Sequence, residues 1–117
     1  MDNGANISCL CLAFTNKVIE LYKYLQEKGE KILSERLLRS GLEVGARVSG
    51  AQNAIGVLCS LDRFDIALLY INDTLYWLNL LFLDGYITKE QYCAVEPLGQ
   101  KIRCYLTTTI CFLKTIR

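Results

Sequence analysis

The chain has 117 residues, of which 52% are hydrophobic and one is proline, and its formal net charge is +1. This length fits a single domain over residues 1–117, and the apolar content excludes an intrinsically disordered chain. The near-neutral charge excludes the whole-molecule attraction to nucleic acid or anionic membranes that a strongly basic protein has.

The first expected helix spans residues 8–28. Its apolar positions recur at helical spacing. They are Phe14, Val18, Leu21, Tyr22 and Leu25. Gly29 follows the last turn, where a residue in the left-handed conformation often ends a helix.

The second expected helix spans residues 33–55, with Ser34 as its N-cap residue and Glu35 at the positive end of the helix dipole. The stripe of this helix, the row of apolar and small residues that share one face, is formed by Leu37, Gly41, Val44, Val48, Ala51 and Ile55. Each glycine in this segment costs about 1 kcal/mol relative to alanine in an exposed helix. We therefore expect a neighbouring helix to approach this glycine-rich face closely.

The third expected helix spans residues 58–84 and ends before Gly85. Of the 20 residues from 64 to 83, 14 are large and apolar. A membrane span is disfavoured, because a carboxylate at mid-span costs about 2.5 to 3.5 kcal/mol. A helix that is apolar on nearly all sides is instead a buried one, and a small bundle cannot cover all of it. The surplus apolar surface predicts self-association, with no membrane partner.

Two polar residues of this helix are expected to be structural. Asp73 has apolar and aromatic neighbours three and four residues away, and Asn72 lies in a polar stripe beside it. The sequence therefore predicts that both are buried polar groups. A buried carboxylate needs a cation, and Arg39 and Arg47 of the preceding helix are the candidates. A functional acid at Asp73 is the alternative.

The fourth expected helix spans residues 88–116. Thr88 and Gln91 form a capping-box pattern at its start, and Pro97 lies inside it, where a kink or a break into two helices is possible. Its expected stripe is Val95, Leu98, Ile102, Tyr105, Thr109, Phe112 and Ile116. Together the segments predict an all-α protein, an antiparallel up-down four-helix bundle.

No catalytic chemistry is indicated by the sequence. There is no histidine, so Ser-His and Cys-His nucleophiles are excluded, and no phosphate-binding glycine motif is present. The six cysteines form no C-x-x-C pair, which argues against zinc. The N-terminal segment lacks signal-peptide features. We expect a cytoplasmic non-enzyme with free cysteines and without a metal, a cofactor or a small-molecule substrate; a carrier of a small apolar ligand is a minor alternative.

Two basic groups are candidates for binding nucleic acid or a partner protein. Arg36, Arg39 and Arg47 project from one face of the second helix, beside Glu43, and arginine suits phosphate recognition. Salt bridges within the bundle are the alternative. The second group comprises Lys101, Arg103, Lys114 and Arg117, and no acid occurs from residue 97 to 117. A solvated helix end would explain these charges equally well.

Several motifs together resemble a known family. They are Lys17-Val18-Ile19-Glu20-Leu21-Tyr22-Lys23-Tyr24-Leu25, Leu37-Leu38-Arg39-Ser40-Gly41, Val44-Gly45-Ala46, Asn72-Asp73-Thr74-Leu75-Tyr76-Trp77-Leu78 and Gly85-Tyr86-Ile87. The chain resembles the four-helix-bundle proteins encoded in bacterial 23S rRNA intervening sequences, also called S23. It is also similar to the accessory variability determinant of diversity-generating retroelements, which binds a reverse transcriptase and nucleic acid.

The resemblance implies a homopentameric ring without catalysis that acts as an RNA or RNA-protein scaffold. A protein-only interaction module is the alternative. The sequence departs from the family pattern at Glu43, Arg47 and Gly50, where the family usually has Ser, Asn and Glu, and at Leu69 and Tyr70, where it has charged residues. The extra apolar side chains favour a larger contact between subunits, and the near-neutral charge weakens the transfer of a nucleic-acid role.

Overall fold

The computed structural model describes residues 3–116, with side chains from residue 7 onward. It contains α1 (Asn3–Glu27), α2 (Ile32–Gln52), α3 (Val57–Leu83) and α4 (Lys89–Ile116), and the described part of the chain has no strand. The all-α prediction is confirmed. Two expected boundaries were wrong: α1 begins before residue 8, and α2 ends at Gln52 and not at 55.

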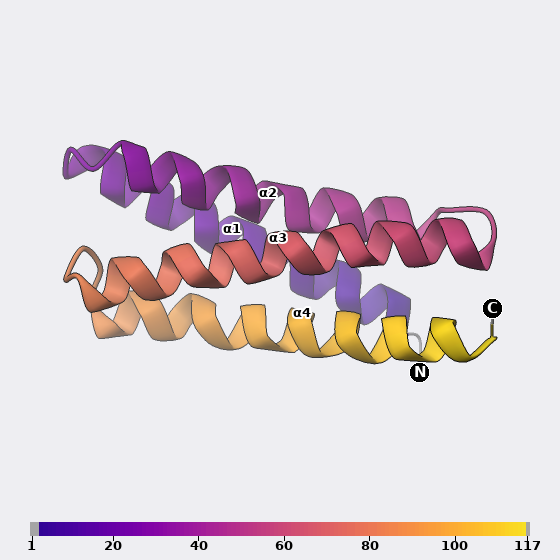
Figure 1. The fold of residues 1–117 in the computed structure, drawn as a ribbon. Helices are drawn as coiled ribbons and strands as arrows, with labels where there is room; N and C mark the ends of the chain where they lie inside the picture. Colours follow the sequence, from indigo (N-terminus) through magenta and orange to yellow (C-terminus); the bar gives the residue numbers. More distant parts are fainter. Residues whose placement is uncertain (1–2, 117) are drawn as a thin grey trace.

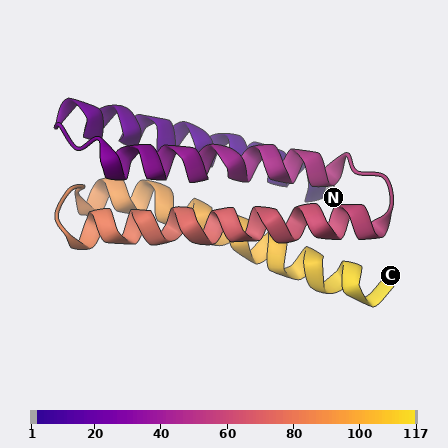
Figure 2. The same cartoon turned by 45° about the horizontal axis from the view of Figure 1, so that its top comes forward.

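Successive helices are connected at alternating ends of the bundle, so that neighbours in the chain run in opposite directions (Figure 1). Each helix contacts the next one, and α1 also contacts α4, whereas the diagonal pairs do not approach within the described residues. The arrangement is therefore a four-sided bundle. The two ends of the chain lie at the same end of the bundle as the turn between α2 and α3 (Figure 2).

Glycines end two of the helices as the sequence indicates. Gly29 has a φ of 86° and Gly85 has a φ of 81°, both in the left-handed region. After α1, the Glu30 N–H donates to the Leu25 carbonyl oxygen at 2.9 Å; after α3, the Tyr86 N–H donates to that of Leu81 at 2.9 Å. These bonds satisfy carbonyls that the helix leaves free and reverse the chain sharply.

The starts of α2 and α4 differ in how well the sequence predicts them. The capping box of α4 is confirmed: the Thr88 N–H donates to Gln91 Oε1 at 2.8 Å, and the Gln91 N–H donates to Thr88 Oγ1 at 3.1 Å. The N-cap prediction for Ser34 was wrong. Glu30 Oε1 instead accepts the Leu33 N–H at 3.0 Å, which lets α2 begin one turn earlier, and Ser34 is fully buried inside the helix.

The stripe predicted for α2 forms one wall of the core. Leu37, Val44, Val48 and Ala51 are at most 1% exposed, and Gly41 is buried. Ile55 is 94% exposed, because the helix ends before it. The expected close approach is confirmed at Gly41, where a Cβ atom would lie 2.8 Å from Val18 Cγ1 of α1.

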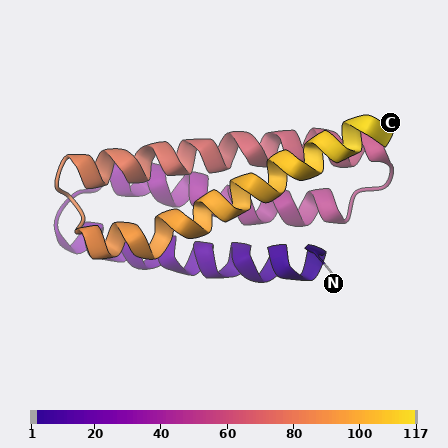
Figure 3. The ribbon, with the colours of Figure 1, turned by 90° about the horizontal axis from the view of Figure 1, so that it is seen from below.

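Helix α4 is continuous through Pro97. Of the two possibilities that the sequence left open, one helix or two, the structure has one helix. Its buried positions are Val95, Gly99, Ile102, Leu106 and Ile110. The predicted stripe was therefore wrong at Phe112 and Ile116, which are 60% and 51% exposed. The reason is geometric: α4 runs obliquely from α1 across α3, so the side that faces the core rotates along the helix (Figure 3).

Candidate functional site

Helix α3 presents an apolar outer surface that the rest of the chain leaves uncovered. Its exposed large side chains include Leu58, Leu69, Tyr76 and Leu83, each at least 60% exposed. By length and mean hydropathy alone, α3 could cross a membrane, and a third of its most apolar stretch is buried in the bundle. The sequence-based inference that one bundle cannot cover this helix is confirmed.

One row of residues on this surface follows a regular spacing, while Cys59, Arg63, Asp65, Asn72 and Asn79 are exposed beside it. The row consists of Leu58, Asp62, Ile66, Leu69, Asp73, Tyr76, Leu80 and Leu83, which we call the α3 seam. After Leu58 and Asp62 the steps alternate between three and four residues, the heptad spacing by which a helix packs along another helix. All members are exposed except the partly buried Leu80. The seam is therefore arranged like a packing surface but faces solvent.

The expected burial of Asn72 and Asp73 was wrong. Both side chains are exposed, because they point away from the wall formed by Ile71, Thr74 and Leu75. Among the described residues, Asp73 pairs with no cation. The polar side chain that is buried in this part of α3 is that of Thr74. It is fully buried, and its hydroxyl donates to the Tyr70 carbonyl oxygen at 2.8 Å. The apolar residues three and four positions from Asp73, such as Leu69 and Tyr76, share its side of the helix and are themselves exposed, so they do not bury it.

All three candidate arginines of α2 are exposed, and two of them lie over aromatic rings of α3. The Arg36 guanidinium lies 5.8 Å from the centre of the Trp77 ring, and that of Arg47 lies 5.7 Å from the centre of the Tyr70 ring. Such contacts hold a guanidinium in place without neutralising its charge. Arg39 has no ion pair or aromatic contact among residues 3–116.

Arg47 is also held by its own helix. Its Nε and Nη2 atoms donate to Glu43 Oε2 at 3.2 and 3.1 Å, and this hydrogen bonding and charge attraction raise the pKa of Arg47. Salt bridges were the alternative interpretation of these arginines, and one is present between Glu43 and Arg47. We call Arg36, Arg39 and Arg47 the arginine edge of α2.

The basic residues of α4 do not form one cluster. Lys101 and Arg103 are two positions apart on a helix and therefore point in different directions, and both are exposed with Lys114. Arg103 Nη2 donates to Gln100 Oε1 of its own helix at 2.6 Å. Arg117 lies outside the described residues. Separate cations of this kind fit a solvated helix end better than a phosphate site.

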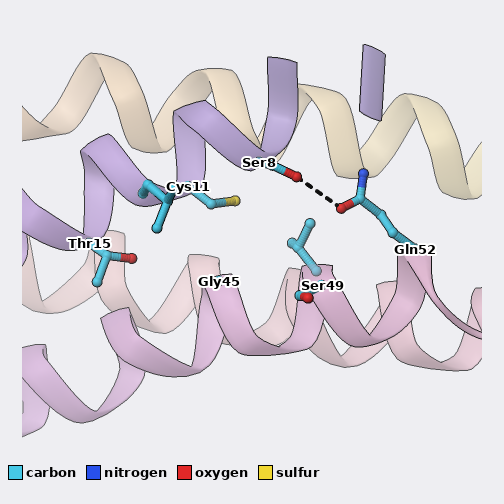
Figure 4. A pocket seen from close by; sticks show the side chains of 8 residues that line it. Ser8, Cys11, Thr15, Gly45, Ser49 and Gln52 are labelled. Carbon is cyan, nitrogen blue, oxygen red and sulfur yellow. Dashed lines mark hydrogen bonds between the residues drawn. The ribbon is translucent and has the colours of Figure 1, made fainter. Parts of the chain in front are cut away.

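A cavity of about 240 Å³ opens between α1 and α2. It is lined by Ser8, Cys11, Leu12, Thr15, Gly45, Val48, Ser49 and Gln52 (Figure 4). Ser8 Oγ donates to Gln52 Oε1 across one end at 3.3 Å. Sequence patterns did not predict this cavity, because its lining residues come from two helices and none carries a charge.

Burial controls the reactivity of the cysteine in this cavity. Cys11 is 5% exposed, and desolvation raises the pKa of its thiol to about 11. It is therefore protonated near neutral pH and a poor nucleophile. All six cysteines are free, the other five are exposed, and no group that could hold a metal ion occurs among the residues described.

These features define an all-α bundle with an uncovered apolar helix and a row of arginines beside it. No family model matches the sequence, and no curated protein matches it. A solved structure does: a protein of unknown function from the S23 ribosomal protein family of Bacteroides thetaiotaomicron is 34% identical, with a TM-score of 0.85 over 89% of this chain and 97% of that chain. The chain belongs to the S23 ribosomal protein family.

Proposed function

We propose that this protein is a non-catalytic, cytoplasmic scaffold or adaptor that works as a homo-oligomer and brings a nucleic-acid-handling partner or a structured RNA to its surface. The observation that carries the proposal is the exposure of the α3 seam. Exposed apolar residues at heptad spacing are unfavourable in water, and burying them against another copy would release that cost. A five-membered ring is the assembly that the resemblance implies.

The mass of the assembly in solution tests the first part. Light scattering on the full chain at micromolar concentration should give a multiple of 13.3 kDa, and a ring would give five times that mass. Replacing Leu69 and Tyr76 together by serine should shift the protein towards monomer. Replacing Leu12 and Phe112, which have similar exposure on α1 and α4, is the matched control and should leave the mass unchanged. A wild-type monomer would contradict the proposal.

The arginine edge supports the second part. Three guanidinium groups on one side of α2 would be repeated in every copy of an oligomer, and arginine pairs well with phosphate oxygens. By analogy with the accessory variability determinant of diversity-generating retroelements, the partner would be a reverse transcriptase with its nucleic acid. A protein-only interaction module is the competing function, and the aspartates of the neighbouring α3 favour it by repelling phosphate.

Filter binding to a structured RNA hairpin across a salt series separates the two functions. RNA binding predicts an affinity that falls steeply with salt and is lost when Arg36, Arg39 and Arg47 are all changed to alanine. Changing Lys17, Lys23 and Lys28 to alanine removes the same charge elsewhere and should have a smaller effect. Absence of affinity at low salt would leave the protein-only function.

A further inference from the structure

Two aspartates interrupt the apolar α3 seam. Asp62 and Asp73 are both exposed members of the seam, with Ile66 and Leu69 between them. The described residues contain two ion pairs, Lys17 with Glu20 and Arg47 with Glu43, so neither aspartate is paired with a cation among them. A partner that covers the apolar side chains must also cover these carboxylates.

The chemistry of the seam restricts what can cover it. Removing a carboxylate from water without a compensating cation costs several kcal/mol, so a purely apolar partner surface would not fit. Anionic partners such as RNA or a phospholipid headgroup would meet like charge. The seam therefore requires a surface that offers apolar contact together with cations at matching positions.

The arginine edge of the same chain offers cations at such positions, namely Arg36 and Arg47, the second of which also pairs with Glu43 of its own helix. Arg36 and Arg47 are eleven residues apart on α2, and Asp62 and Asp73 are eleven residues apart on α3. At 1.5 Å per residue, each pair is separated by about 16 Å along its helix. The match holds whether the two helices run in the same or in opposite directions. The contacts with Trp77 and Tyr70 already hold both guanidinium groups towards the α3 side of α2.

Resting on the self-association proposed above, we infer that the α3 seam of one copy packs against the arginine edge of α2 in another copy, with Asp62 and Asp73 paired to Arg36 and Arg47. This contact occupies two of the three arginines that could otherwise meet phosphates, so it favours the protein-only function over RNA binding. The helix charges agree with this contact. Helix α2 has three arginines against two glutamates, and α3 has three aspartates against one arginine. The apolar residues of the seam provide the contact area, and the ion pairs fix its register.

Charge exchange tests this contact directly. One variant changes Asp62 and Asp73 to arginine, a second changes Arg36 and Arg47 to aspartate, and a third combines all four changes. Each of the first two places like charges in the contact and should weaken association by about tenfold or more in sedimentation velocity. The third restores opposite charges and should recover association to within about threefold of the wild type.

Matched controls separate this contact from general charge and folding effects. Changing Glu27 and Glu90 to arginine alters the net charge as the aspartate variant does, at exposed sites away from the seam, and should not weaken association. Thermal unfolding of each variant at low concentration shows whether the bundle remains folded. Changing Arg36 and Arg47 to alanine gives a milder loss if the aspartate variant does not fold.

The outcomes distinguish the inference from the proposal on which it rests. A wild-type monomer overturns both. An oligomer whose mass is unchanged by either charge exchange overturns the inference and leaves the scaffold in place, as does a folded four-change variant that fails to recover association. Recovery in the four-change variant supports the pairing, because independent losses of stability would add up when the two pairs of substitutions are combined.

Discussion

Helices α2 and α3 contrast in how their apolar residues are used. Helix α2 is interrupted by glycines and charges, yet its stripe of Leu37, Val44 and Val48 is almost completely buried. Helix α3 is far richer in large apolar residues, yet Leu69 and Tyr76 remain at least 60% exposed. Apolar content therefore does not measure how much of a helix enters the core of its own chain. Whether a side chain enters the core depends on its direction relative to the neighbouring helices. The apolar side chains of α3 that point away from the core are available for a partner.

The largest loss of stability should come from shortening a buried side chain of α2. Leu37→Ala removes a side chain with no exposure and leaves a cavity, so we expect a loss of about 2 to 5 kcal/mol in the free energy of unfolding. Leu69→Ala, on the uncovered side of α3, should cost little in the isolated chain.

Urea denaturation at several protein concentrations measures both changes. The Leu69→Ala midpoint should differ from that of the wild type only at concentrations where the protein associates. An equal loss for the two variants at all concentrations would show that Leu69 belongs to the core of its own chain.

A smaller effect is expected from two glycines on α2. Gly41→Ala places a Cβ atom 2.8 Å from Val18 Cγ1, and the branched valine cannot turn away without moving α1, so we expect a loss of about 1 to 3 kcal/mol. In Gly45→Ala the nearest atom is Thr15 Oγ1 at 3.5 Å, an ordinary contact. That variant should gain up to about 1 kcal/mol, since alanine favours helix.

Thermal unfolding monitored by circular dichroism tests this pair. The melting temperature should fall for Gly41→Ala and rise or stay constant for Gly45→Ala. Changes of the same sign and size would mean that the close approach of α1 and α2 does not depend on the position of the glycine.

The smallest effect concerns two cysteines of α1: Cys11 is buried against α2, and Cys9 is exposed. The pKa of Cys11 is raised from 9.0 to about 11, so the folded protein retains a proton that the unfolded chain releases. Stability from this group is present below pH 9 and falls as the pH rises from 9 towards 11.

Alkylation by iodoacetamide measures the difference in exposure between Cys9 and Cys11. At pH 8 the Cys11→Ser variant should react as fast as the wild type, whereas Cys9→Ser should lose a reactive site, as counted by mass spectrometry. Removing Cys11 should also flatten the fall in stability above pH 9. Rapid modification of Cys11 in the folded protein would contradict its burial.

Local patterns predicted the helices and several of their ends. Gly29 and Gly85 adopt the left-handed conformation, and Thr88 and Gln91 form the capping box, because each depends only on residues within one turn. Ser34 was misassigned as a cap although its sequence pattern is equally local. Glu30, four residues earlier, offers a competing acceptor, and only the geometry decides which of the two is used.

The sequence by itself determined the class of the protein: four helices, the buried stripe of α1 and that of α2 up to Ala51, and more apolar surface on α3 than one chain can bury. Tertiary structure decided what faces solvent. It exposed Asp73, rotated the core side of α4 away from Phe112, and set Arg36 over Trp77. The physical reason is that helix periodicity fixes which residues share a face, whereas the crossing of neighbouring helices fixes which face is covered.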